Sequence, residues 1–264
     1  MLELQSISKT FHPGTIHAKK ALQNLSLSLN DGDFVTVIGG NGAGKSTLLN
    51  AIAGVWPVDE GSILIDGVDV TGLPEYKRAA FIGRVFQDPM LGTAPNMQIE
   101  ENLALALRRG KKRTLRWGVT KQEREDYYER LHALGLGLEK RMTDKVGLLS
   151  GGQRQALTLL MASLQKPKLL LLDEHTAALD PATAEKVLEL TQRIVEESHI
   201  TCLMVTHNMT QALELGNRTL MMADGHIVMD VSGKERERMT VDSLVAKFKA
   251  GTGRALDNDR MLLS

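Results

Sequence analysis

The 264-residue chain contains a single cysteine, Cys202, and no excess of charge of either sign. One thiol cannot form an intramolecular disulfide or a cysteine-rich metal site, so both are excluded, which fits a reducing compartment. Lysine plus arginine number 32, as do aspartate plus glutamate, so the formal net charge is +0. Proteins that bind nucleic acids usually have a basic excess, and this chain has none.

Long apolar stretches are also lacking. No uninterrupted apolar run approaches the ~20 residues that a membrane-spanning helix needs. The first residues have neither a basic segment nor an apolar one, so we expect no signal peptide. A role at a membrane would therefore depend on a partner. The chain is 42% hydrophobic and long enough to form one large domain with a subdomain.

A glycine-rich loop at residues 39–47 is the strongest motif, because it matches the pattern G-x-x-x-x-G-K-[ST]. An apolar run at 34–38 predicts a strand before it, and residues 48–53 predict a helix that ends at Gly54. Glycines let backbone N–H groups point at a phosphate, and the helix N-terminus adds partial positive charge. A turn before an ordinary helix is the alternative. The predicted phosphate-binding residues are Gly39, Gly40, Asn41, Gly42, Ala43, Gly44, Lys45, Ser46 and Thr47. We expect Lys45 to reach the β- and γ-phosphates and the Ser46 hydroxyl to bind Mg²⁺.

The remaining pattern predicts an α/β chain with a helical insertion. Alternation and apolar runs predict strands within residues 2–38 and at 61–67, 81–86, 168–172 and 200–206. A hairpin of two strands, 220–223 and 226–231, is predicted around Asp224-Gly225. Periodicity predicts helices at 100–109, 121–134, 154–164, 181–198 and 241–249. The tail therefore holds one weakly amphipathic helix, and residues 251–264 are expected to be poorly ordered.

A basic run at residues 108–113 precedes Trp117 in the helical insertion. It is consistent with a patch for nucleic acid or anionic lipid, and also with a solvated connection between two helices. A solvated connection is the commoner role for so short a run.

Asp173 and Glu174 follow four consecutive leucines, a pattern typical of a parallel strand buried on both faces. In P-loop nucleotide hydrolases an acid in this place holds Mg²⁺, and Asp173 fits that role. The adjacent Glu174 is the candidate general base that deprotonates the attacking water. Two acids after a strand can also be a solvated turn, but the phosphate loop upstream favours the catalytic interpretation.

A second potential anion site occurs at residues 149–153, where Ser150, Gly151, Gly152 and Gln153 precede a helix. By itself this pattern fits an ordinary N-cap. It also offers backbone N–H groups, a hydroxyl and a helix N-terminus, but no lysine. Two phosphate-binding loops in one chain are readily explained if each serves the nucleotide of a different subunit.

With these motifs in order, residues 2–230 resemble the ATP-binding cassette (ABC) ATPases. The matching segments are residues 39–47, Gln87 before Asp88-Pro89, residues 149–153, 169–174 and 178–180, and His207 after a strand. The resemblance implies a P-loop core with a parallel sheet, an antiparallel β subdomain and an inserted helical subdomain. The whole chain is then one domain (1–264), with its core at 1–89 and 166–232, helical subdomain at 90–165 and tail at 233–264.

The resemblance also implies roles for single residues. Gln87 would contact Mg²⁺ or the attacking water, and residues 150–152 would close on the γ-phosphate held by Lys45 of a second subunit. Asp180 would relay information across the dimer, and His207 would hold Glu174 and the water in line. Taken alone, His207 is more often a strand-end histidine with a satisfied hydrogen bond.

Two aromatic positions differ from the usual family pattern. Phe11 replaces the tyrosine that stacks on adenine, and its ring can serve without the hydroxyl, although it can also be a hairpin core residue. His175 stands where the family usually has proline. It is either a ligand or sensor, or a tolerated substitution, and this version resembles a subgroup paired with lipoprotein solute receptors.

The resemblance implies an ATPase that uses ATP and Mg²⁺ and is the subunit of a membrane transporter, a bacterial importer for an amino-acid-like solute. Its expected partners are a second copy in a head-to-tail dimer, an integral membrane permease and an extracytoplasmic solute-binding protein, with no nucleic acid. The expected location is the cytoplasmic face of the cell membrane. A cassette ATPase acting on ribosomes or DNA is the alternative, and one cassette, no sustained heptads and one cysteine argue against it. A non-catalytic regulator conflicts with the complete set of acids, histidine and phosphate loop.

Overall fold

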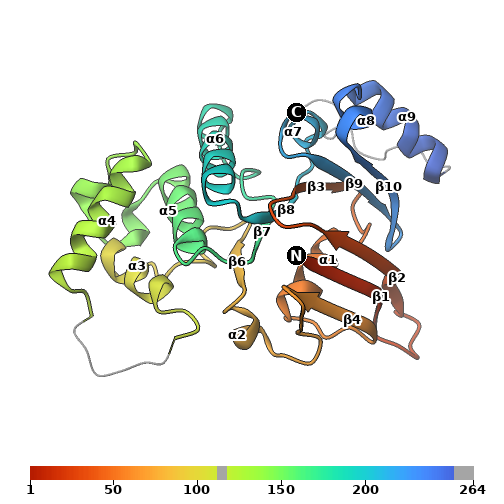
Figure 1. Cartoon of the computed structure of the whole chain (residues 1–264), viewed down its shortest axis with the longest axis horizontal. Helices are drawn as coiled ribbons and strands as arrows, with labels where there is room; N and C mark the ends of the chain where they lie inside the picture. The colour runs from red at the N-terminus through yellow and green to blue at the C-terminus, as the bar shows by residue number, and fades with distance from the viewer. Residues whose placement is uncertain (112–117, 253–264) are drawn as a thin grey trace.

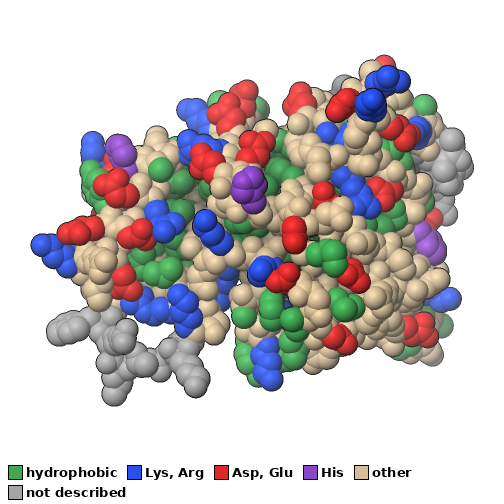
Figure 2. Space-filling view, viewed as in Figure 1, with side chains coloured by type: hydrophobic (Ala, Val, Ile, Leu, Met, Phe, Trp, Pro, Cys, Tyr) green, Lys and Arg blue, Asp and Glu red, His purple; other side chains and the backbone are tan. Residues whose placement is uncertain are grey.

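The computed structural model describes residues 1–111 and 118–252. The described residues form a six-stranded sheet, a four-stranded sheet and helices around both, with a group of helices at one end (Figure 1). None of the helices in the described ranges is long and apolar enough to span a bilayer. Acidic and basic side chains are interspersed over the face shown in Figure 2, as the zero net charge suggests.

The six-stranded sheet has the order β10-β9-β3-β8-β7-β6. Its strands are parallel from β9 to β6, and β10 pairs antiparallel with β9 at one edge. The central strands are buried on both faces, which explains their continuous apolar sequences. The bounds are β3 (Phe34–Gly39), β6 (Ile82–Val85), β7 (Leu169–Asp173), β8 (Thr201–Val205), β9 (Arg218–Ala223) and β10 (His226–Ser232).

The four-stranded sheet is antiparallel and has the order β2-β1-β4-β5. Its inward-facing leucines and isoleucines join the core of the six-stranded sheet in one cluster with helix α1. The bounds are β1 (Leu2–Phe11), β2 (Lys19–Leu29), β4 (Glu60–Ile65), β5 (Val68–Asp69) and α1 (Lys45–Ala53).

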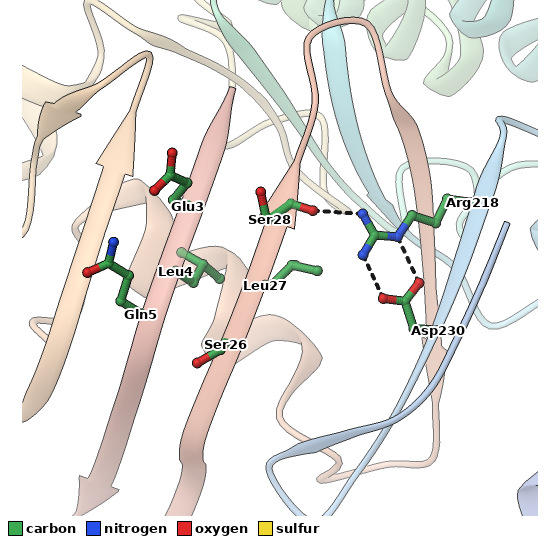
Figure 3. A pocket seen from close by; sticks show the side chains of 8 residues that line it. All are labelled: Glu3, Leu4, Gln5, Ser26, Leu27, Ser28, Arg218 and Asp230. Carbon is green, nitrogen blue, oxygen red and sulfur yellow. Dashed lines mark hydrogen bonds and ion pairs between the residues drawn. The ribbon is translucent and has the colours of Figure 1, made fainter.

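Arg218 joins the two sheets on one side of the molecule. Its guanidinium donates two hydrogen bonds to the Asp230 carboxylate, at 2.7 and 2.6 Å, and one to the Ser28 carbonyl at 2.7 Å. Figure 3 shows this group between β2 and β10, at the edge of a hollow also lined by Glu3 and Gln5.

The inserted helices form a lobe with its own apolar cluster, drawn at the left of Figure 1. Leu103, Tyr127, Leu131 and Leu157 are fully buried there. The helices of this lobe are α3 (Ile99–Leu107), α4 (Lys121–Ala133) and α5 (Gly151–Ser163), with the 3-10 helices η1 (Leu138–Arg141) and η2 (Val146–Leu148). The other helices are α2 (Glu75–Arg78), α6 (Pro181–Ser198), α7 (Met209–Glu214), α8 (Gly233–Glu237) and α9 (Val241–Thr252).

The α/β class, the phosphate-loop helix and the N-cap Asp180 with Pro181 are confirmed. The expected start of α5 at Arg154 is wrong, because Gly151 already belongs to the helix. A reciprocal pair of hydrogen bonds between Ser150 and Gln153 caps α5 and offsets the low helix propensity of two glycines.

The interpretation of the tail also needs correction. Two helices follow β10, and the second extends through Gly251 to Thr252, so the expectation of disorder is wrong for these two residues. Leu244 explains why α9 forms, because it is fully buried in a cluster with Met209 and Met221. The rest of the segment expected to be poorly ordered, residues 253–264, lies outside the described residues.

Arg108 and Arg109, from the described part of the basic run, contact other residues of the helical lobe. Arg108 forms an ion pair with Glu123 at 2.8 Å, and Arg109 donates to the Ala162 carbonyl at 3.3 Å. These contacts favour the helix connection over a binding patch. Lys112, Arg113 and Trp117 lie outside the described residues.

Candidate active site

The predicted catalytic residues gather at one edge of the six-stranded sheet. The phosphate loop follows β3, Gln87 follows β6, Asp173 ends β7 and His207 follows β8, and these four strands are parallel. Parallel strands end at the same edge, which is where open α/β sheets bind ligands. The sheet topology therefore brings residues from four distant segments to one place.

Two glycines of the phosphate loop are required by close backbone contacts. A Cβ atom at Gly39 would lie 2.3 Å from the Met222 carbonyl oxygen, and one at Gly44 would lie 2.5 Å from that of Ala21. Gly44 is also the N-cap of α1, with a left-handed φ of 104° and no capping side chain. No acid occupies the first turn of α1, so the N-terminal N–H groups face the loop without a neighbouring carboxylate on that helix.

Lys45 lies inside the loop. Its side chain is buried, and Nζ donates to the carbonyls of Gly39 at 2.7 Å and Gly40 at 3.1 Å. Burial lowers the pKa of Lys45, while the nearby carboxylates of Glu174 and Asp173 act in the opposite direction. A cation held among loop carbonyls and facing two acids is well placed to bind a phosphate anion.

Glu174 and His207 lie in direct contact, with His207 Nε2 2.5 Å from Glu174 Oε1. Glu174 has a φ of 46°, a left-handed conformation that is unusual for a residue other than glycine. Such backbone strain clusters at functional sites. The pair has the arrangement expected of a carboxylate base oriented by a histidine.

The donor set suits Mg²⁺, which prefers oxygen ligands and keeps several waters. Ser46 is exposed in the first turn of α1, Gln87 is exposed after β6, and Asp173 is partly buried. Burial is the main cause that raises the pKa of Asp173, and the neighbouring Glu174 charge raises it further. Arg84, Lys45 and His207 lower this pKa and partly offset the rise. Two adjacent carboxylates whose repulsion is offset by cations are what a divalent metal would stabilise. Among residues 1–111 and 118–252, no group of three or more His, Cys, Asp or Glu side chains offers a metal cage, so such an ion would rely on waters and phosphates as further ligands.

Arg84 is a site residue that the sequence analysis missed. It lies in β6, and its guanidinium approaches the Asp173 carboxylate to 4.0 Å. The signal was a lone arginine in an otherwise apolar strand.

The second predicted phosphate loop belongs to the helical lobe, at the N-terminus of α5, separate from α1 in Figure 1. The Ser150 hydroxyl accepts a hydrogen bond from the Gln153 N–H at 3.3 Å, which leaves its own hydrogen to donate. The loop abuts the residues after β7: a Cβ atom at Gly152 would lie 2.1 Å from Thr183 Cγ2. Asp180 caps α6 beside it and accepts from the Thr183 N–H at 3.1 Å.

Phe11 lies at the end of β1 and is half-buried. Its ring packs edge-to-face with Trp56 at 4.9 Å, a contact that the sequence analysis did not predict. The residue paired with it is Lys19, whose Nζ lies near Gly42 of the phosphate loop. Phe11 is therefore paired with a residue whose side chain reaches the phosphate loop.

His175 is directed into the protein and is 2% exposed. Its Nε2 lies 3.0 Å from the Thr191 hydroxyl of α6. This packing favours a structural substitution over a ligand at the site.

Comparisons with known proteins give one consistent result. A family model described as ABC transporter matches residues 22–177. A tyrosine transport ATP-binding protein of Clostridioides difficile is 47% identical over 249 residues, which cover 94% of this chain and 99% of the relative. A spermidine/putrescine import ATP-binding protein PotA of Pasteurella multocida is 35% identical over 250 residues, 94% of this chain but 62% of the relative. The chain thus spans less than two thirds of that protein.

Solved structures give the same result. A dimeric post-hydrolysis state of the ATP-binding cassette MJ0796 with ADP and Pi superposes with a TM-score of 0.75 at 30% identity, covering 88% of this chain and 98% of the other. The ADP conformation of MJ1267, an ATP-binding cassette of an ABC transporter, superposes with a TM-score of 0.77 at 28% identity, covering 95% and 98%.

Proposed function

This chain belongs to the ABC transporter family and is an ATP-binding ATPase subunit, and we propose that it powers the import of an amino-acid-like solute. Relatives are ATP-binding proteins of transporters, and a solved neighbour is a dimer, so its partners are a second cassette and a membrane permease. The name of the relative at 47% identity, a tyrosine transport protein, supports the solute class.

The observation that carries the hydrolytic part is the contact between Glu174 and His207 at the sheet edge that also holds Lys45. Glu174 accepts the proton of the attacking water, and His207 holds the carboxylate and water in line. Lys45 binds the β- and γ-phosphates. Mg²⁺, held by Ser46, Asp173 and Gln87, would neutralise charge on the phosphates.

The dimer is a head-to-tail sandwich in this proposal. Each nucleotide lies between the phosphate loop of one chain and residues 150–152 of the other, with Gln153 supporting the cap and Asp180 at the interface. Phe11 stacks on the adenine. Support comes from the two loops lying on separate parts of one chain, so that a second copy is needed to bring them to one nucleotide.

The remaining partners follow from this arrangement. Coupling segments of the permease dock beside Gln87 and the helical lobe, and the cassette sits on the cytoplasmic face of the membrane. An extracytoplasmic solute-binding protein delivers the solute to the permease. The solute does not touch the cassette, so its identity rests on relatives and not on this site.

The test is a mild-detergent pull-down of tagged Glu174→Gln protein from native membranes with ATP and Mg²⁺. Recovery of a multi-spanning permease with a solute receptor supports the proposal, and the receptor then allows a screen of amino acids. Recovery of ribosomal proteins or nucleic acid without a membrane protein refutes it. Lys45→Ala is the control, because loss of nucleotide binding should reduce recovery with ATP.

A further inference from the structure

Arg84 is a largely buried cation to which the proposed hydrolysis assigns no role. Its side chain is 12% exposed, and burial lowers its pKa, which Asp173 and Glu75 partly counteract. Nε is buried and has no hydrogen-bond partner among the described residues. Burying a guanidinium with an unsatisfied donor costs free energy, so its retention calls for a specific reason.

The contacts of Arg84 reach the surroundings of each candidate metal ligand. Nη2 donates to the Asn50 Oδ1 atom at 2.8 Å, and Asn50 Nδ2 donates to the Ser46 carbonyl at 2.8 Å. The same Nη2 lies 4.0 Å from Asp173 Oδ2. The guanidinium carbon lies 4.5 Å from the centre of the Phe86 ring, and Phe86 directly precedes Gln87.

We propose that Arg84 is a positioning residue that holds Ser46, Asp173 and Gln87 at the separation needed to bind Mg²⁺ with the nucleotide. The three ligands come from α1, β7 and the segment after β6, and no single element fixes their mutual position. The planar guanidinium is suited to this role because it accepts stacking on its face while donating at its edge. This inference rests on the proposed function.

The effect on metal affinity has a definite sign. A positive charge 4.0 Å from Asp173 repels a divalent ion, so a purely electrostatic role predicts tighter metal binding once Arg84 is removed. A positioning role predicts the opposite, because ligands that are no longer held together bind metal more weakly. Removing such outer contacts weakens metal binding by roughly tenfold or more.

The measurement is the dissociation constant of a non-hydrolysable ATP analogue by calorimetry, once with Mg²⁺ and once with EDTA. The dissociation constant with EDTA divided by that with Mg²⁺ gives the factor by which the metal strengthens binding. A merely structural loss of affinity changes both constants equally and leaves this ratio unchanged. Titration of Mn²⁺ by electron paramagnetic resonance, with the analogue at saturation, provides a direct second readout. Neither readout depends on hydrolysis.

We expect Arg84→Met to reduce the ratio about tenfold and to weaken Mn²⁺ binding to the same extent. Arg84→Lys keeps the charge without the planar fork and should also reduce the ratio. If Arg84→Met does not fold, Asn50→Ala is the second variant, and we expect it to reduce the ratio as well. Combining Arg84→Met with Asn50→Ala should reduce the ratio no further than either change alone, because both remove the hydrogen bond between Arg84 and Asn50.

The matched control is Arg109→Met. Arg109 also has a buried Nε without a hydrogen-bond partner in residues 1–111 and 118–252, and its pKa is lowered by burial, but it lies in the helical lobe. Its replacement should leave the ratio unchanged. An unchanged or larger ratio in Arg84→Met overturns the inference while the proposed function stands, and wild-type protein that binds no analogue overturns both.

Discussion

The His175 imidazole lies between the loop after β7 and helix α6, where its Nε2 is 3.0 Å from Thr191 Oγ1. The Thr191 hydroxyl donates its hydrogen to the Val187 carbonyl at 2.7 Å. Because a hydroxyl has one hydrogen, His175 must be the donor in the other contact, as a neutral ring protonated on Nε2. Burial lowers the pKa of His175 from 6.5 to about 4.

This shift makes the fold sensitive to mild acid. Between the two pKa values the unfolded chain binds more protons than the folded one, so the free energy of unfolding falls as the pH falls. The contribution is complete above pH 6.5 and is lost progressively down to about pH 4. At about 1.4 kcal/mol per pKa unit, the shift corresponds to about 3 kcal/mol in total, of which about 2 kcal/mol is lost at a pH of about 5.

Urea unfolding at a pH of about 7.5 and again at about 5 tests this expectation. His175→Gln places an amide N–H where Nε2–H lies, so the bond to Thr191 can persist without a titrating group. The other titratable groups are the same in both proteins, so their contributions to the pH dependence of the free energy of unfolding cancel when the two proteins are compared. We expect the wild type to lose about 2 kcal/mol more than the variant. Equal losses would refute the assignment of a buried, neutral histidine.

Three further predictions concern the dimer, the α5–α6 contact and the link between the sheets. Glu174→Gln should form a stable dimer with Mg²⁺ and ATP in light scattering, and a protein that stays monomeric would contradict the sandwich. Gly152→Ala should lower the free energy of unfolding, measured with urea, by about 1–3 kcal/mol, because the added Cβ overlaps Thr183 Cγ2. Thr183→Ser removes that methyl group, so the double variant should regain stability, and no regain would contradict this reason. Arg218→Met should lower the same free energy by about 1–3 kcal/mol through loss of its bonds to Asp230 and Ser28, as measured by urea unfolding, whereas unchanged stability would show that the link is dispensable.

Short-range patterns were sufficient to predict most strands and the candidate residues at their ends. The apolar run of β7 ends at Asp173, and β8 is followed by His207, so each functional residue could be placed from its own segment. The contact between Glu174 and His207 required the resemblance to the family, because the order of strands is not contained in their periodicity.

The features that were missed depend on contacts between distant segments. Arg84 interrupts an apolar strand, but its importance appears only because β6 lies beside β7 and faces Asn50. Trp56, which follows α1, contacts Phe11 at the end of β1. Helix α8 was missed because its five residues are too few to show a helical period. Helix α5 begins three residues before the expected Arg154 because Ser150 and Gln153 cap its N-terminus.

The left-handed backbone of Glu174 has a consequence for mutational screens. A residue other than glycine pays about 1 kcal/mol to adopt this conformation, whereas asparagine enters it more readily. Glu174 also places a negative charge beside Asp173. Glu174→Asn relieves both costs, loses the contact with His207 and removes the proposed base, so we expect an inactive protein that is about as stable as the original. A library selected for abundant, folded protein would therefore retain inactive sequences at this position, and only a selection for transport would require glutamate.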